Sequence, residues 1–482
     1  MKKCIFYLCL LLALVPAMMS GQNKQQKKIT IMGMGDSITE GGNSFTCYLY
    51  PLWEKLYAAG YETDFIGPRK SKNRLGTLDH CGFGGKTVEF LDSLTDSIYK
   101  KYPADIVLLH AGHNHFVEQK PVAGMIASYK SIIGKIKKIN PKACILIAKV
   151  IESGKLPKYS YIPELNKEIE DMVDSMNDRS VRLVDMAEKF DWTRHTIKDK
   201  VHPNAEGADI MASVWLEELK KVLPKPKTEY KPEIAVYKVQ PNGKEMKLHI
   251  FRNKKAKTDK PSAAIVYFFG GGWANGTPLQ FYRECDYYSS KGMTAITVDY
   301  RIRSIDGTSP FESIEDAKDA MRWIRSHASE LNIDPERIAA GGASAGGQLA
   351  AALGTLKDGK EDGGVSYRTN LMLLYYPVVD NGPDGYGPKE MKERYKDVSP
   401  LHNIDRETPP SLFLIGDKDH LIPISTAEAF RDKCEKNGTE CELHVFKGCG
   451  HPIFSYRKPL DKVFYDVRRL TDNFLKKYGY MK

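Results

Sequence analysis

Short apolar stretches alternate with longer amphipathic stretches along the first half of the chain. Residues 28–32, 105–109 and 143–148 are apolar runs of strand length, whereas residues 123–139 carry apolar side chains at helical spacing. Strands that alternate with helices predict a parallel sheet covered by helices on both faces. Because sites in such sheets gather at the carboxyl ends of the strands, we expect the chemistry of this half just beyond those runs.

The hydrophobic pattern changes near residue 223. Residues 224–233 are rich in Lys and Pro and have no apolar period, which predicts a semi-extended linker. Beyond the linker, residues 234–251 read as two strands around a turn, and further buried strands and helices follow. We therefore expect two α/β domains, one over residues 22–223 and one over residues 234–482.

The first 21 residues have the pattern of a secretory signal. Lys2 and Lys3 form the charged start, residues 4–15 the apolar stretch, and residues 16–21 a small-residue exit. We expect this segment to be removed on export to the periplasm or the cell exterior. The apolar stretch is short for a membrane-spanning helix, so we expect no membrane span once the segment is removed.

Composition narrows the possible partners. The 482 residues are 42% hydrophobic and 27% charged, as in a soluble globular protein of two or three domains. The formal net charge of +10 is scattered, and no basic run with interleaved aromatics argues for nucleic acid. Two of the nine cysteines lie in the predicted leader, and the odd number that remains predicts no disulfide framework. Two local pairings stay open: Cys434 with Cys441, and Cys47 with Cys81.

A glycine-flanked serine in the second half has the sequence context of a nucleophile elbow. Gly342-Ala343-Ser344-Ala345-Gly346 follows an apolar run at residues 337–340 and opens into a helical stretch at residues 348–353. The turn crowds the serine backbone, so only small residues fit beside it. The helix N-terminus then directs N–H groups and a positive dipole end at an oxyanion formed beside Ser344.

The first half contains four motifs that resemble the blocks of the SGNH (GDSL-type) hydrolases. They are Gly35-Asp36-Ser37-Ile38, Gly82-Phe83-Gly84-Gly85-Lys86-Thr87, Gly112-His113-Asn114 and Asp199-Lys200-Val201-His202-Pro203. The resemblance implies a flavodoxin-like three-layer domain with Ser37 as nucleophile, His202 as base and Asp199 orienting the base. It also implies an oxyanion hole formed by Ser37, Gly85 and Asn114. The family usually has Asp after that Asn, where this chain has His115, so we expect Asn114 to depend on other partners.

The second half resembles the α/β-hydrolases, and within them the hormone-sensitive-lipase type and its carbohydrate-esterase relatives. Gly342–Gly347 matches the elbow, and Phe269-Gly270-Gly271-Gly272-Trp273 matches the H-G-G-G-W loop with Phe in place of His. The resemblance implies Ser344 as nucleophile and His451 as base. Asp419 is the expected acid, with Asp417 as runner-up, and the oxyanion donors are Gly271, Gly272 and Ala345. The lost His normally braces the loop, so we expect other groups to hold it.

Three histidines lie close together in the sequence, but we predict neither a metal site nor a cofactor. Along a strand, His113 and His115 would share a face while His110 points away. No carboxylate or cysteine stands near them at ligand spacing. We therefore expect these histidines to line the cleft.

Together these features predict an exported serine esterase with two catalytic domains. The resemblance implies O-acyl esters, mainly acetyl, on plant polysaccharides or oligosaccharides as substrates, hydrolysed through acyl-enzymes. One alternative is a single active domain beside a degenerate binding module, marked by Phe269 or His115. Others are a C-terminal feruloyl-type esterase or peptidase, whereas a lipase lacks a long apolar lid. The sequence leaves the oligomeric state open.

We also expect the two sites to differ in acyl size. The first site suits a small acyl group on a bulky sugar, because short glycine-rich loops surround it. The second has nearby aromatics that could pack a larger acyl group or a sugar ring. These are Trp273, Phe281, Tyr282, Tyr287 and Tyr288. The competing interpretation, which we weigh about equally, is that these side chains belong to the core.

Overall fold

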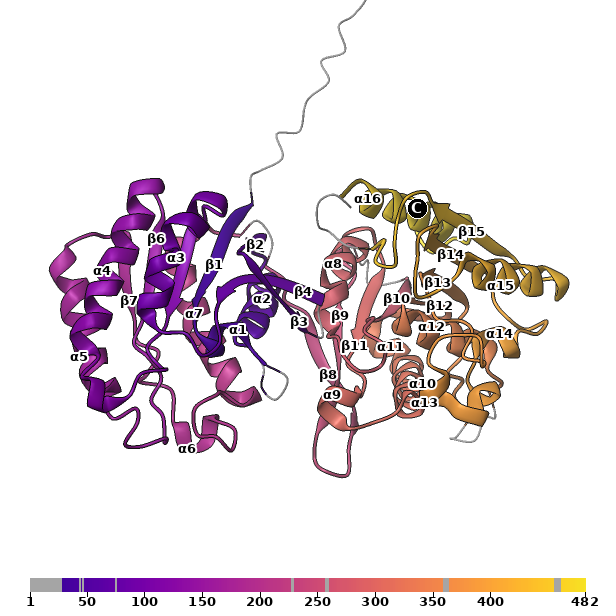
Figure 1. Cartoon of the computed structure of the whole chain (residues 1–482). Helices are drawn as coiled ribbons and strands as arrows, with labels where there is room; N and C mark the ends of the chain where they lie inside the picture. The colour runs from indigo at the N-terminus through magenta and orange to yellow at the C-terminus, as the bar shows by residue number, and fades with distance from the viewer. Residues whose placement is uncertain are drawn as a thin grey trace, which may run out of the picture.

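The computed structural model describes residues 28–42, 45, 47–73, 76–226, 229–255, 260–358, 364–454 and 461–482. The predicted signal segment lies outside the described residues. Two α/β domains follow one another along the chain, the first indigo to magenta and the second salmon to yellow (Figure 1). In the described part of the chain, no helix is both long and apolar enough to cross a membrane.

The first domain is built on a mostly parallel sheet. Its strands are β1 (Ile29–Gly35), β2 (Thr63–Phe65), β3 (Arg69–Asn73), β4 (Gly76–Gly82), β5 (Ile106–His110), β6 (Cys144–Ala148) and β7 (Val181–Val184). Their order is β3-β4-β1-β5-β6-β7, with β2 paired to the start of β1. Only β3 runs antiparallel, against β4. The hydrophobic pattern did not predict β3, because its sequence Arg-Lys-Ser-Lys-Asn is polar throughout.

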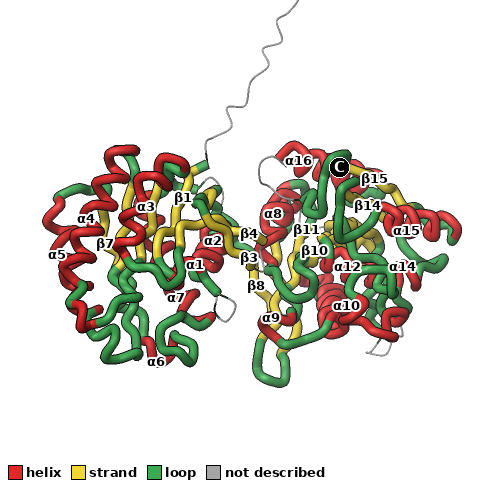
Figure 2. The backbone as a smooth tube through the Cα atoms, in the orientation of Figure 1, coloured by secondary structure: helices red, strands yellow, loops and turns green. Residues whose placement is uncertain are grey.

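Helices cover both faces of this sheet and leave its strands in the interior (Figure 2). The helices are α1 (Ser37–Glu40), α2 (Leu49–Ala58), α3 (Val88–Lys101), η1 (Val117–Gln119), α4 (Val122–Ile139), α5 (Ile162–Met176), α6 (Trp192–His195) and α7 (Ala205–Val222). One core cluster joins the sheet to α3, α4 and α5, and a second joins it to α2 and α7. The predicted three-layer fold is therefore confirmed.

The second domain has an eight-stranded sheet in the order β15-β14-β13-β12-β10-β11-β9-β8. Its strands are β8 (Glu233–Val239), β9 (Glu245–Phe251), β10 (Ser262–Phe268), β11 (Thr294–Val298), β12 (Ile333–Ala343), β13 (Leu371–Tyr375), β14 (Ser411–Gly416) and β15 (Cys441–Phe446). The central strands are parallel and apolar throughout, as buried parallel strands are. The hairpin β8–β9 closes one edge in antiparallel register and leaves much of β8 exposed.

Helices also surround the second sheet (Figure 1). They are η2 (Pro278–Phe281), α8 (Tyr282–Ser290), α9 (Arg303–Asp306), α10 (Pro310–Ser326), α11 (Ala328–Leu331), α12 (Ala345–Thr355), α13 (Pro388–Met391), η3 (Lys392–Asp397), α14 (Pro400–Asn403), α15 (Ile424–Lys436) and α16 (Asp461–Lys477). The architecture is the predicted α/β-hydrolase fold. Cys434 and Cys441, and likewise Cys47 and Cys81, are buried free thiols.

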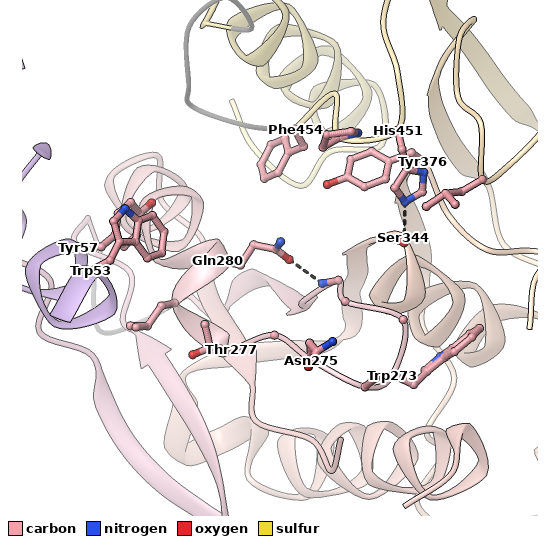
Figure 3. A pocket seen from close by; sticks show the side chains of 18 of the residues that line it. Trp53, Tyr57, Trp273, Asn275, Thr277, Gln280, Ser344, Tyr376, His451 and Phe454 are labelled. Carbon is pink, nitrogen blue, oxygen red and sulfur yellow. Dashed lines mark hydrogen bonds between the residues drawn. The ribbon is translucent and has the colours of Figure 1, made fainter. Parts of the chain in front are cut away.

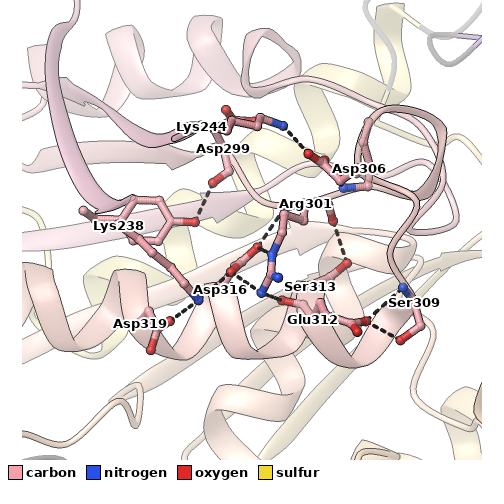
Figure 4. A network of polar contacts seen from close by, with 12 residues as sticks. Lys238, Lys244, Asp299, Arg301, Asp306, Ser309, Glu312, Ser313, Asp316 and Asp319 are labelled. Carbon is pink, nitrogen blue, oxygen red and sulfur yellow. Dashed lines mark hydrogen bonds and ion pairs between the residues drawn. The ribbon is translucent and has the colours of Figure 1, made fainter. Parts of the chain in front are cut away.

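A buried polar network fixes the edge hairpin and the loop after β11 to helix α10 (Figure 4). Asp316 is fully buried and accepts hydrogen bonds from Arg301 Nε at 2.7 Å and from the Arg301 backbone N–H at 3.0 Å. Lys238 of β8 lies 3.0 Å from the same carboxylate. A buried carboxylate needs such partners because its desolvation is costly. The network therefore holds the residues on either side of Tyr300, whose ring takes part in the second site.

Two candidate active sites

The first site brings together the three side chains predicted for it. Ser37 begins α1 at the end of β1, and its Oγ lies 2.8 Å from His202 Nε2. His202 Nδ1 lies 2.5 Å from Asp199 Oδ2, while Asp199 Oδ1 accepts hydrogen bonds from the N–H groups of Val201 and His202. Burial alone would raise the pKa of Asp199, but these hydrogen bonds outweigh burial and lower it. The arrangement can pass a proton from the serine to the imidazole.

The glycine turn after β4 approaches Ser37 closely. A Cβ added at Gly84 would lie 3.7 Å from the Ser37 Cβ. The Gly84 N–H is already bonded to the Glu40 carboxylate at 2.5 Å, whereas no described residue accepts a hydrogen bond from the Gly85 N–H. Gly85 has φ +71°, a conformation that favours glycine. These features leave Gly85 available as an oxyanion donor.

Asn114 is oriented by a backbone carbonyl rather than by its neighbour in sequence. Its Nδ2 donates to the Lys86 carbonyl oxygen at 3.0 Å, and its backbone has φ +76°. His115 turns elsewhere, with Nε2 2.9 Å from a Glu89 carboxylate oxygen and Nδ1 3.3 Å from Gln119 Oε1. The amide of Asn114 therefore keeps its second N–H for a ligand although the usual Asp is missing.

The geometry assumed for the three histidines was wrong. Strand β5 ends at His110, so His113 and His115 lie in the loop beyond it and share no strand face. His113 is buried with Nδ1 3.8 Å from an Asp36 carboxylate oxygen, while His115 faces Glu89. Among the described residues, no three His, Cys, Asp or Glu side chains are grouped to hold a metal ion.

The second site is built on a strained serine between β12 and α12. Ser344 has φ 53° and ψ −118°, a rare conformation for a residue with a side chain. The glycines around it are required by space: a Cβ at Gly342 would lie 2.2 Å from the Gly346 carbonyl oxygen, and a Cβ at Gly346 would lie 2.2 Å from the Phe268 carbonyl oxygen. This close packing presents the Ser344 hydroxyl at the end of the strand.

His451 connects Ser344 to Asp419 (Figure 3). Its Nε2 lies 2.8 Å from Ser344 Oγ and its Nδ1 lies 2.7 Å from Asp419 Oδ2. The Asp419 side chain is fully buried. Burial would raise its pKa, but the hydrogen bond from His451 and those from two backbone N–H groups lower it. Asp417 is instead exposed and accepts a hydrogen bond from the Gly448 N–H at 2.6 Å, away from the imidazole.

The loop after β10 runs beneath Ser344 with glycine conformations. Gly271 has φ +138° and Gly272 has φ +62°. No described residue accepts a hydrogen bond from either N–H group. Ala345 is the first residue of α12, where backbone N–H groups lack intrahelical partners. The three predicted oxyanion donors are therefore available, and a Cβ at Gly270 would already be 3.4 Å from the Ser344 Cβ.

Two side chains brace this loop in place of the missing histidine. Phe269 stacks on Tyr300 with ring centroids 4.0 Å apart, and the Tyr300 hydroxyl donates to the Phe269 carbonyl at 2.6 Å. The Gly270 N–H donates to Gln280 Oε1 at 2.6 Å. No motif in the sequence pointed to Tyr300 or Gln280 as supports, because both lie outside the elbow and the glycine loop.

The sequence also missed an aromatic neighbour of each imidazole. The Phe45 ring stacks on His202 at 4.1 Å between centroids, and the Tyr376 ring stands edge-on to His451 at 4.8 Å. Tyr376 follows β13 in a left-handed conformation, φ 39°. Neither carries a sequence signal of its own, since each is a single aromatic residue far from the motifs.

The aromatic residues expected to bind the larger group mostly belong to the core. Trp273 is 2% exposed and its Nε1 donates to Gln348 Oε1 at 3.1 Å. Phe281 and Tyr288 are buried, and the Tyr287 hydroxyl bonds to Asp472. The expectation that these rings bind substrate was therefore wrong. A pocket of about 1110 Å³ nevertheless opens at Ser344 and His451, and other aromatic residues line it (Figure 3).

Known proteins resemble both halves of the chain. The GDSL-like lipase/acylhydrolase family matches residues 34–210, and the BD-FAE family matches residues 248–381. Among solved structures, the apo form of Thermogutta terrifontis esterase 2 is 34% identical, with a TM-score of 0.50. The match covers 54% of this chain and 99% of that one.

Curated relatives are more distant. Esterase LipC of Mycobacterium tuberculosis is 25% identical over 214 residues, which is 39% of this chain and 51% of that protein. The acetylxylan esterase of Xylanibacter ruminicola is 26% identical over 210 residues, 40% of this chain and 42% of that protein. The chain spans about half the length of these curated relatives. With the family matches, the chain consists of a domain of the GDSL-like lipase/acylhydrolase family followed by an α/β-hydrolase domain of the BD-FAE family.

Proposed function

We propose that the chain is an exported serine esterase with two catalytic sites, acting on O-acyl esters of plant polysaccharides or oligosaccharides. The observation that carries this proposal is that each domain has a serine 2.8 Å from a histidine whose other ring nitrogen meets a carboxylate. Two complete relays favour two active domains over one active domain and a degenerate binding module. The predicted leader at residues 1–21 supports export.

Each relay supports hydrolysis in two steps without a cofactor. The histidine takes the Oγ proton as the serine attacks the ester carbonyl, and the N–H donors stabilise the oxyanion. Collapse of the tetrahedral intermediate expels the sugar hydroxyl, which receives the proton from the histidine. Water activated by the same histidine then hydrolyses the acyl-enzyme, releases the acid and restores the serine.

A carbohydrate substrate has two supports. One relative is an acetylxylan esterase, and BD-FAE and GDSL-like domains stand together in this chain. The pocket at Ser344, about 1110 Å³, exceeds what an acetyl group alone requires and leaves room for a sugar. Acetyl esters are the proposed main substrates.

Serine variants of the full chain test the proposal. Ser37→Ala and Ser344→Ala should each remove one activity, and the double variant should lose on the order of 10⁴-fold or more. The substrates are p-nitrophenyl acetate, acetylated xylan and feruloylated oligosaccharides, with released acids identified by chromatography. Loss of all hydrolysis from one single variant would leave only one catalytic domain. Aryl-ester hydrolysis without release from any sugar ester would refute the carbohydrate assignment.

A further inference from the structure

The pocket that opens at Ser344 is lined by both domains. Gly270–Gln280, Tyr376 and His451 line it from the second domain. Trp53 and Tyr57 of α2 line it from the first domain, together with Tyr61, Glu62 and Asp64 around the start of β2. Figure 3 shows Trp53 and Tyr57 across the pocket from Ser344 and His451, with Gln280 between the two groups. The first domain therefore forms part of the second domain's site.

Contacts between the domains hold this wall in position. Arg283 of α8 pairs with Glu62 at 3.0 Å. Tyr230, from the segment between the domains, lies with its ring centroid 5.9 Å from that of Tyr57, and its N–H donates to the Ala58 carbonyl at 3.4 Å. These contacts fix the end of α2 that faces the pocket. A rigid wall costs little entropy when a ligand binds against it.

The chemistry of the wall differs from that of the pocket beside Ser344. Near the serine, Tyr376 and Phe454 present largely buried aromatic surfaces. On the wall, the half-buried rings of Trp53 and Tyr57 stack 5.5 Å apart at 19° and lie beside the exposed carboxylates Glu62 and Asp64. Ring faces next to hydrogen-bond acceptors suit a ligand that has both C–H surfaces and hydroxyl groups. A sugar ring has both.

We propose that Trp53 and Tyr57 of the first domain form a sugar subsite of the Ser344 site. The acyl group lies at Ser344, and the sugar released as the leaving alcohol, or the next sugar of its chain, packs against the α2 rings. The two domains then act as one specificity unit at this site, beyond being two linked esterases. This inference rests on the proposed carbohydrate substrate.

The test uses the full chain with Ser37→Ala, so that only the Ser344 site turns over. Trp53→Ala is added and kcat/KM is measured on p-nitrophenyl acetate and on an acetylated xylo-oligosaccharide. We expect a loss of about tenfold or more on the oligosaccharide, through KM, because lost stacking of 1–2 kcal/mol corresponds to that factor. We expect less than about a twofold change on the aryl ester, which does not reach the wall.

Two further variants separate binding from folding. Trp53→Phe keeps a ring and should restore part of the oligosaccharide activity. Phe116→Ala removes an aromatic ring that is 51% exposed on the same domain, outside the pocket, and should change neither substrate. An equal loss on both substrates, or no loss on the oligosaccharide, would overturn the subsite. If the Ser37→Ala parent hydrolyses only the aryl ester, the proposed substrate class itself is wrong.

Discussion

Phe269 and Tyr300 lie ring on ring, 4.0 Å between centroids and 14° apart, and the Tyr300 hydroxyl donates to the carbonyl of Phe269. Phe269 occupies the position where related esterases carry a bracing histidine. The tyrosine supplies the hydrogen bond from outside the motif, and the Arg301–Asp316 pair anchors the neighbouring residue. The glycine loop can therefore keep its shape without the histidine.

Tyr300→Phe tests this brace. The buried Phe269 carbonyl would lose its partner, so we expect the free energy of unfolding to fall by about 1–2 kcal/mol. Misplaced oxyanion donors should also lower kcat/KM at the Ser344 site by about tenfold or more. The matched control is Tyr367→Phe, whose hydroxyl donates to the Lys357 carbonyl at 2.6 Å far from the loop. The control should lose stability but not turnover; equal turnover in both variants would contradict the role of Tyr300.

Asp419 and Asp417 lie two residues apart but should behave differently. Asp419→Asn leaves an amide facing His451 Nδ1 and favours the wrong tautomer, so we expect kcat at the Ser344 site to fall by roughly 10³-fold or more. Asp417→Asn should leave kcat nearly unchanged, because that carboxylate is bonded to the Gly448 N–H. Kinetics of both variants in the Ser37→Ala background measure this. The opposite pattern would make Asp417 the acid.

The exposure of the two relays predicts a division of work by acyl size. In the first site, the Asp199 side chain is 38% exposed and that of His202 is 22% exposed. In the second, those of Asp419 and His451 are 0% and 11% exposed at the end of a large pocket. An open site suits an acetyl group on a bulky sugar, whereas an enclosed pocket gains binding energy from a larger acyl group.

We therefore expect Ser344→Ala to keep acetyl release and to lose most activity on longer or aromatic acyl esters. Acetate and ferulate released from xylan oligosaccharides, quantified side by side for both serine variants, measure the division. Ser37→Ala should show the reverse loss. A Ser37→Ala protein that retains acetyl release but no longer cleaves the larger esters would overturn it.

Stability should fall in mild acid because of buried histidines. Burial, together with nearby Arg69 and against the opposing Glu40, lowers the pKa of His80 to about 4. Its Nδ1 accepts the Gly82 N–H at 3.0 Å, so a proton there would displace a hydrogen bond. The folded pKa lies below the unfolded value of 6.5, so the stabilisation is complete above pH 6.5 and is lost toward pH 4. His110 and His249 are lowered similarly, each to about 4.

The free energy of unfolding, measured in urea at several pH values, tests this. Each such histidine contributes a slope of about 1.4 kcal/mol per pH unit between pH 6.5 and 4. His80→Gln should remove one such contribution, whereas His420→Gln, at an exposed histidine, should leave the slope unchanged. An unaltered slope in the His80 variant would show that this imidazole does not titrate as inferred.

The sequence by itself determined the two folds and the residues at both relays. Apolar runs separated by amphipathic stretches force parallel sheets, because such strands must be buried on both faces. Motif residues such as Ser37 and Ser344 could be named because local backbone constraints, chiefly glycine next to a crowded serine, leave a mark in the sequence. The polar strand β3 could not be predicted, since its place depends on pairing with β4 and not on burial.

Only the tertiary structure decided which distant side chains support and complete the sites. Tyr300 and Gln280 brace the glycine loop, and Phe45 covers His202, through contacts between segments with no shared pattern. The same is true of Trp53 and Tyr57, which lie about 290 residues before the serine whose pocket they line. Trp273 shows the converse: its position beside the glycines suggested a binding surface, yet packing and a bond to Gln348 bury it. Packing between segments is decided by the whole fold, so no local stretch records it.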